Sequence, residues 1–176
     1  MKGCGLCWTE AELALLDGDP ALVPDKVVWQ FAWEVEDHFE PEEYGPAWRR
    51  LGYRVIGLLD DDPDSRLTMG LTWAGWQDWP EAERTALYEQ VTDVVLRAAA
   101  DENRLRDLGE LLQAAAQLDQ SLTPWLRLAD TLPDEVVEHL AEEWSDVNSA
   151  NSTFGTWLRW TGPTPQEEVE EWLSTR

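Results

Sequence analysis

Lysine is scarce in this chain of 176 residues: Lys2 and Lys26 are the only lysines, and Lys and Arg together number 13 against 36 acidic residues. The formal net charge is therefore −23 at pH 7. Binding to nucleic-acid phosphates depends on clustered Lys and Arg, so we expect no direct nucleic-acid binding. No stretch approaches the roughly 20 apolar residues that cross a bilayer, and no apolar signal segment follows Lys2. We expect a cytoplasmic protein that does not enter membranes.

Cysteine and histidine are equally rare, with two of each. Cys4 and Cys7 form a C-x-x-C motif, which thiol oxidoreductases place at a helix N-terminus within an α/β scaffold, but no βαβ pattern surrounds this motif. A closed zinc site needs four ligands. The chain has no second Cys pair, and His38 and His139 are distant in sequence from the thiols. We therefore predict unpaired or opportunistically oxidised thiols and no metal or other cofactor, with a thiol redox enzyme using Cys4 and Cys7 as the alternative.

Each histidine follows a glutamate by four residues: Glu34 precedes His38, and Glu135 precedes His139. Such a pair shares one side of a helix, but this spacing is more often a solvated side-chain pair. A dimetal carboxylate site would need Glu-x-x-His on two helices. The acidic run 60–64 lacks the alternating acids, central Gly and closing Glu of a calcium loop. No phosphate-binding or Ser/His/Asp motif is present either, so we predict no catalytic residues and a protein that is not an enzyme.

Helical periodicity, by contrast, is abundant. Apolar residues recur at intervals of three and four within 48–59, 87–98, 105–116 and 136–147, on one side of a helix in each segment. Thr9 and Glu12 match a capping box, and prolines followed by acidic residues mark other helix starts. The predicted fold class is all-α, with about eight to ten helices. We expect helices over 9–17, 24–38, 45–60, 66–76, 80–99, 102–118, 122–130, 133–147, 154–160 and 165–174.

An internal echo indicates how these helices are arranged. The segment 23–28 (Val-Pro-Asp-Lys-Val-Val) recurs as 132–137 (Leu-Pro-Asp-Glu-Val-Val), and Pro80 begins a similar helix between them. We predict one all-helical domain over 1–176, with three hairpin units that start near 24, 80 and 133. This irregular stack of antiparallel αα-hairpins is α-solenoid-like and resembles HEAT and armadillo repeat proteins in architecture, although no repeat-family consensus is matched. The alternative is chance recurrence of Pro-Asp at helix starts, where it is common.

Tryptophan is over-represented, with 12 residues. Trp73, Trp76 and Trp79 are spaced by three and flanked by glycines that permit close approach, so they would form one ridge on a helical turn. Trp29 and Trp33 lie on a different side of their helix from its apolar face. That helix is therefore either sandwiched between neighbours or offers one side to a partner. Rings of this size either fill gaps between imperfect repeats or remain exposed as anchors.

The acidic residues are spread over the whole chain, with two dense segments. One is the C-terminal helix around Trp172. The other, the densest, contains Glu34, Glu36, Asp37, Glu40, Glu42 and Glu43. A negative field of this strength accelerates the approach of a basic partner. We therefore predict a non-enzymatic acidic helical protein that binds a basic macromolecule, such as a basic protein, as an immunity-type inhibitor or a charge mimic. Adaptation to high salt is the other explanation of the charge.

Overall fold

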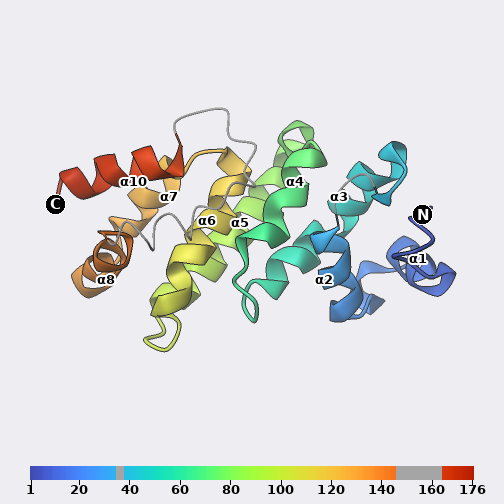
Figure 1. Ribbon diagram of the computed structural model, residues 1–176, viewed down its shortest axis with the longest axis horizontal. Helices are drawn as coiled ribbons and strands as arrows, with labels where there is room; N and C mark the ends of the chain where they lie inside the picture. The colour runs from blue at the N-terminus through green and yellow to red at the C-terminus, as the bar shows by residue number, and fades with distance from the viewer. Residues whose placement is uncertain (35–37, 146–163) are drawn as a thin grey trace.

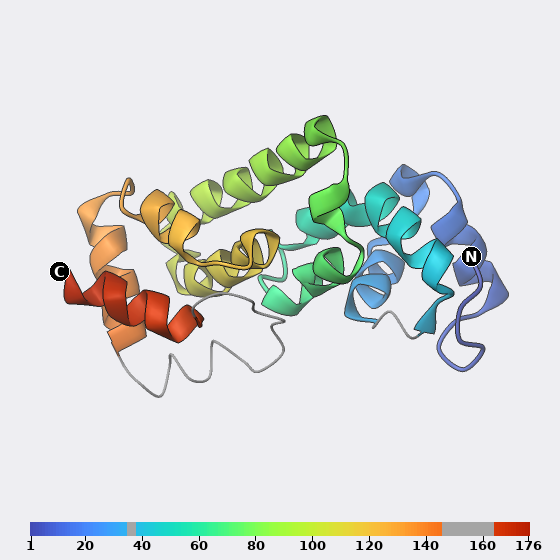
Figure 2. The same cartoon turned by 90° about the horizontal axis from the view of Figure 1, so that it is seen from above.

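The computed structural model describes residues 1–34, 38–145 and 164–176, which form an elongated helical body (Figure 1). Nine α-helices lie within these ranges, so the predicted all-α class and number of helices are confirmed. The helices succeed one another along the long axis, with the two termini toward opposite ends (Figures 1 and 2). A solenoid of three repeated units remains a prediction. Within the described ranges, no helix is both long enough and apolar enough for a membrane span.

The described residues contain α-helices of 5 to 19 residues and several short 3-10 helices. The α-helices are α1 (Glu10–Asp17), α2 (Asp25–Trp33), α3 (Pro41–Leu58), α4 (Met69–Trp73), α5 (Glu81–Ala99), α6 (Leu108–Asp119), α7 (Thr123–Ala129), α8 (Asp134–Ser145) and α10 (Pro165–Ser174). The 3-10 helices lie in the connections: η1 (Pro20–Leu22), η3 (Ser65–Thr68), η4 (Trp76–Asp78) and η5 (Leu105–Asp107).

Local signals account for most helix starts. The Oγ1 atom of Thr9 accepts the N–H of Glu12 at 3.2 Å, and Oε2 of Glu12 accepts the N–H of Thr9 at 2.9 Å, so the predicted capping box is confirmed. Thr164 and Glu167 form the same box at α10. Helices α2, α5 and α8 each begin directly after a proline, within one residue of the predicted starts. Proline suits this position because the first helical N–H groups have no partner within the helix.

The prediction between residues 33 and 45 is wrong in its boundaries. The helix expected over 24–38 ends at Trp33, and the one expected from 45 already begins at Pro41, so that Pro46 lies inside α3. Gly3 and Phe39 form an isolated antiparallel bridge. This bridge pairs the chain before α3 with the N-terminal segment, a long-range contact that no local pattern predicts. The helix expected over 154–160 lies outside the described residues.

The helix expected over 66–76 is also interrupted. It consists of η3 and α4, and α4 ends at Trp73. Gly75 then adopts a φ of +64°, which a residue with a side chain rarely takes. The turn at Gly75 therefore separates Trp73 from Trp76 and breaks the continuous ridge that the three-residue spacing predicts.

The core is a single hydrophobic cluster that extends from the N-terminal turn to α10. Its centre is α6, in which all residues except Glu110 and Asp119 are buried. Helices α4, α5 and α7 and the 3-10 helix η3 all contact α6. A helix surrounded in this way must be apolar on nearly every side, which explains why the run from 108 to 118 has so few charged residues.

Polar side chains connect the surrounding elements to α6 at buried points. Thr68 donates from Oγ1 to the carbonyl of Ala114 at 2.9 Å, and Trp76 donates from Nε1 to the carbonyl of Leu118 at 3.1 Å. Both bonds satisfy groups that would otherwise be costly to bury. They also place η3 and η4 against the C-terminal half of α6.

Candidate functional site

The first candidate site is built on the turn that precedes α1. The N–H groups of Cys7 and Trp8 both donate to the carbonyl of Cys4, at 3.1 and 3.0 Å, which folds the C-x-x-C segment back on itself. The N–H of Cys4 donates to the carbonyl of His38 at 2.8 Å. The chain at His38 is thereby brought against the turn that carries both cysteines.

A histidine ring lies next to the thiols as a result. The Nδ1 atom of His38 is 3.2 Å from Sγ of Cys7 and 2.9 Å from Oε2 of Glu34. One ligand atom each from Cys4, Cys7 and His38 lies within 4.8 Å of the others, and all three residues are half-buried. His38 is distant from the thiols in sequence, but the fold places it beside them. We name the group of Cys4, Cys7, His38 and Glu34 the thiol–imidazole cluster.

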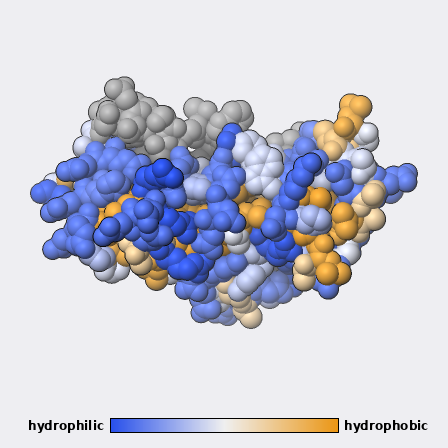
Figure 3. Space-filling view, turned by 90° about the horizontal axis from the view of Figure 1, so that it is seen from below, coloured by the Kyte–Doolittle hydropathy of each residue, from blue (hydrophilic) through white to orange (hydrophobic). Residues whose placement is uncertain are grey.

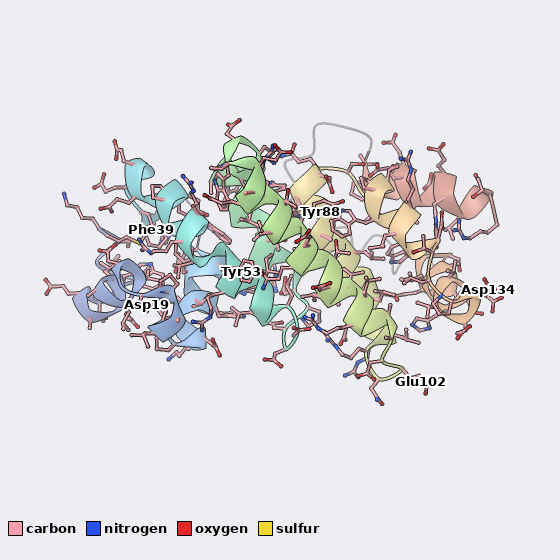
Figure 4. All side chains as sticks on the ribbon, turned by 180° about the vertical axis from the view of Figure 1, so that it is seen from behind. Asp19, Phe39, Tyr53, Tyr88, Glu102 and Asp134 are labelled. Carbon is pink, nitrogen blue, oxygen red and sulfur yellow. The ribbon has the colours of Figure 1, made fainter. Side chains whose placement is uncertain are left out.

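Aromatic packing in the core supports the residues next to this cluster. Phe39, labelled in Figure 4, is buried, and its ring centroid lies 5.6 Å from that of Trp8 and 5.5 Å from that of Phe31. Gln30 of α2 donates from Nε2 to the carbonyl of Cys7 at 2.9 Å. The thiol turn and the chain at His38 are thus both attached to the hydrophobic core, which limits their relative movement.

The two thiols have different electrostatic surroundings. The pKa of Cys4 is lowered because the backbone N–H groups of Leu6 and Cys7 donate to its sulfur, and the Cys7 thiol donates to it as well. The pKa of Cys7 is raised because its S–H is engaged with Cys4 and because it is partly desolvated. Both thiols are free rather than joined in a disulfide. Such a pair can bind a thiophilic metal ion or be oxidised.

Most of the tryptophans proposed as anchors are packed into the body. Trp76 is 5% exposed and Trp172 is 7% exposed, so the prediction that they could be surface anchors is wrong. The indole N–H of Trp172 donates to Asp130 at 2.7 Å, which fixes α10 beside the end of α7. Trp73 and Trp79 are half-buried against the core. These rings fill the spaces between helices, which is the structural alternative that the sequence left open.

The densest acidic segment does not form one uniform surface in the described residues. Glu34 is half-buried beside His38, and Glu43 accepts the N–H of Lys2 at 2.5 Å. Glu40 and Glu42 are exposed. Glu36 and Asp37 lie outside the described residues.

An exposed indole occurs instead on α2. Trp29 is 37% exposed, and its Nε1 donates to Oδ2 of Asp62 at 2.7 Å. Its ring centroid lies 4.9 Å from that of Trp33, one helical turn further on. The guanidinium of Arg66 lies 3.7 Å from the centroid of the Trp33 ring. The sequence indicated this pair only as a second face of its helix. Asp62, from the loop after α3, and Arg66, from η3, reach the pair only in the folded chain.

Charge on the surface is unevenly balanced. Most arginines in the described ranges are engaged in ion pairs: Arg49 with Glu83, Arg50 with Asp17, Arg54 with Asp25, Arg66 with Asp64, Arg97 and Arg104 with Asp60, Arg106 with Asp107 and Arg176 with Asp130. The remaining acidic residues exceed the available positive charge, which leaves a negative exterior. On the face shown in Figure 3, hydrophilic residues predominate and the hydrophobic ones form small groups, mainly toward the N-terminal end.

Comparison of the chain with protein-family models, with curated proteins and with solved structures finds no match in any of the three.

Proposed function

We propose that the protein binds a basic protein, in the manner of an immunity-type inhibitor or a charge mimic. The observation that carries this proposal is the exposed indole of Trp29, held by Asp62 and placed beside Trp33. We name Trp29, Trp33 and Asp62 the Trp29 surface.

The chemistry of the Trp29 surface favours a Lys or Arg side chain. A cation over a tryptophan face is attracted by the ring electrons, and tryptophan is the strongest of the aromatic residues in this respect. Arg66 already places its guanidinium over Trp33, so a ring at this position accommodates such a group. The Asp62 carboxylate adds a negative charge 2.7 Å from the neighbouring indole nitrogen. A basic side chain of a partner would therefore meet an aromatic face and a carboxylate together.

The overall charge supports the same type of partner. A net charge of −23 with most arginines already paired creates a negative field around the molecule. Such a field attracts a basic protein from a distance and rejects an acidic one, and salt weakens both effects. The field would bring the partner near, and the Trp29 surface would select its point of contact.

A fluorescently labelled peptide of ten arginines tests the proposal by fluorescence anisotropy. We expect salt-sensitive binding that Trp29→Ala weakens about two- to fivefold, since an exposed cation–π contact contributes about 0.5–1 kcal/mol. Asp62→Asn should also weaken it, because the amide oxygen still accepts the indole N–H but the charge is lost. Tyr53→Ala is the matched control: Tyr53, labelled in Figure 4, is 58% exposed on α3 and lies outside the Trp29 surface.

Two results would contradict the proposal. If the Trp29→Ala and Tyr53→Ala variants bound the peptide with equal affinity, Trp29 would contribute no more to binding than another exposed aromatic ring. Absence of peptide binding by the native chain at low salt would show that the negative exterior does not attract a basic partner.

A further inference from the structure

The thiol–imidazole cluster is not used by the proposed function, and its chemistry points elsewhere. We infer that Cys4, Cys7 and His38 bind a Zn²⁺ ion, with the carboxylate of Glu34 as the fourth ligand of a tetrahedral site. This inference rests on the geometry of the cluster and is independent of the Trp29 surface.

The distances between the ligand atoms are close to those of a zinc site. With Zn–S near 2.3 Å and Zn–N and Zn–O near 2.0–2.2 Å, neighbouring ligand atoms in a tetrahedron lie about 3.3–3.8 Å apart. The Nδ1 atom of His38 lies 3.2 Å from Sγ of Cys7 and 2.9 Å from Oε2 of Glu34. The sulfur of Cys4 lies within 4.8 Å of the ligand atoms of both Cys7 and His38. The three Cys and His donors therefore already surround one point, and the Glu34 carboxylate, which contacts His38, would turn toward the thiols to complete the site.

The donor set selects the kind of metal. Two thiolates and an imidazole favour Zn²⁺ over Mg²⁺ or Ca²⁺, which prefer oxygen ligands. The N–H of Cys4 donates to the carbonyl of His38 at 2.8 Å, and Nε2 of Gln30 donates to the carbonyl of Cys7 at 2.9 Å. These bonds hold the segments that carry the ligands, as outer-shell contacts do around metal sites.

The ion would connect two segments that lie far apart in the sequence. Cys4 and Cys7 belong to the turn before α1, whereas Glu34 is the C-cap of α2 and His38 precedes α3. The backbone bond from Cys4 to His38 and the Gly3–Phe39 bridge already join these segments. With four protein ligands the site has no open position, so the ion would stabilise this junction rather than perform chemistry.

Metal titration of the full chain, purified without a polyhistidine tag and kept reduced, tests the inference. We expect one Zn²⁺ per chain, measured in competition with a chromophoric chelator, and a higher melting temperature when zinc is bound. Co²⁺ in its place should give the intense visible absorption of a tetrahedral thiolate site. Cys4→Ser, Cys7→Ser and His38→Gln should each weaken binding at least about 100-fold, and Glu34→Gln about tenfold.

The chain supplies its own matched control. Glu135 and His139 on α8 repeat the four-residue spacing of Glu34 and His38, and no cysteine is present in that part of the sequence. Glu135→Gln and His139→Gln should therefore leave zinc affinity unchanged. Circular dichroism of each variant confirms that the helices are intact, and zinc protection of the native thiols from alkylation gives a second readout that needs no substitution.

Several outcomes would overturn the inference. One is that the reduced native chain binds no zinc at micromolar concentration. Another is that the His139→Gln variant loses as much zinc affinity as the His38→Gln variant. A Cys4–Cys7 disulfide that forms readily in air, combined with no zinc binding after reduction, would instead favour a redox role for the thiol pair.

Discussion

A glycine and a tryptophan from neighbouring helices share one space in the core. Trp48 of α3 is fully buried, and a Cβ atom on Gly70 of α4 would lie 2.1 Å from Cζ2 of its ring. Non-bonded atoms do not approach so closely, so the indole can occupy this position only because residue 70 has no side chain. The close contact between α3 and α4 at this point therefore requires glycine at position 70.

Gly70→Ala should therefore lower the free energy of unfolding by about 1–3 kcal/mol, the usual cost of an overpacked core. Urea denaturation followed by circular dichroism measures this change. Gly57→Ala in α3 is the matched control: Gly57 is exposed, its nearest neighbouring atom would be 3.9 Å from the new Cβ, and alanine is the better helix former. We expect that control to leave stability equal or up to about 1 kcal/mol higher, so a loss of equal size in both variants would contradict the packing argument.

At the scale of elements, one helix caps another. Helix α7 has no side-chain cap of its own. The buried carboxylate of Glu168 in α10 instead accepts the N–H of Leu122 at 2.7 Å, the hydroxyl of Ser121 at 2.6 Å and the hydroxyl of Thr123 at 2.7 Å. These donors lie at the N-terminus of α7, where the helix dipole also favours a negative charge. The start of α7 is therefore fixed by α10.

Glu168→Gln should lower the free energy of unfolding by about 1–3 kcal/mol. The amide keeps one acceptor oxygen but directs an NH₂ group at groups that already donate, which leaves buried donors unsatisfied. Glu171→Gln on the same helix is exposed and should change stability by no more than about 0.5 kcal/mol. Equal urea midpoints for the two variants would show that Glu168 does not cap α7.

Across the whole molecule, charge repulsion between carboxylates and the burial of some of them both favour protonation of the folded state. Burial raises the pKa of Glu110, partly opposed by hydrogen bonds from Ser65, and burial raises the pKa of Glu143, partly opposed by His139. The folded state therefore holds these protons more tightly than the unfolded chain does. The pKa of Glu12 and that of Glu167 are instead lowered, because each carboxylate accepts hydrogen bonds in a capping box.

The stability of the protein should therefore be highest on the acidic side of neutrality. Groups with a raised pKa favour the fold most at or below their ordinary value of 4.5 and lose that contribution as the pH rises through their folded pKa. The capping carboxylates act oppositely: their contribution is present above 4.5 and is lost as the pH falls through their lowered pKa. We expect a higher melting temperature near pH 5 than near pH 8, by scanning calorimetry, and a decline below about pH 4.

The double variant Glu110→Gln, Glu143→Gln isolates the buried carboxylates from general charge repulsion. Its melting temperature should depend less on pH, between about 5 and 8, than that of the native chain. A native melting temperature that is constant or rises across this interval would contradict the linkage.

The sequence by itself determined the helical class and most helix starts, because periodicity, capping boxes and prolines act within a few residues of one another. The starts of α1, α2, α5 and α8 were predictable for this reason. Whether a tryptophan is buried was not predictable, because Trp29 and Trp76 differ in the neighbours that other helices supply. Only the tertiary structure decided that His38 meets Cys7, because the contact joins residues 31 apart through backbone pairing that no local pattern encodes.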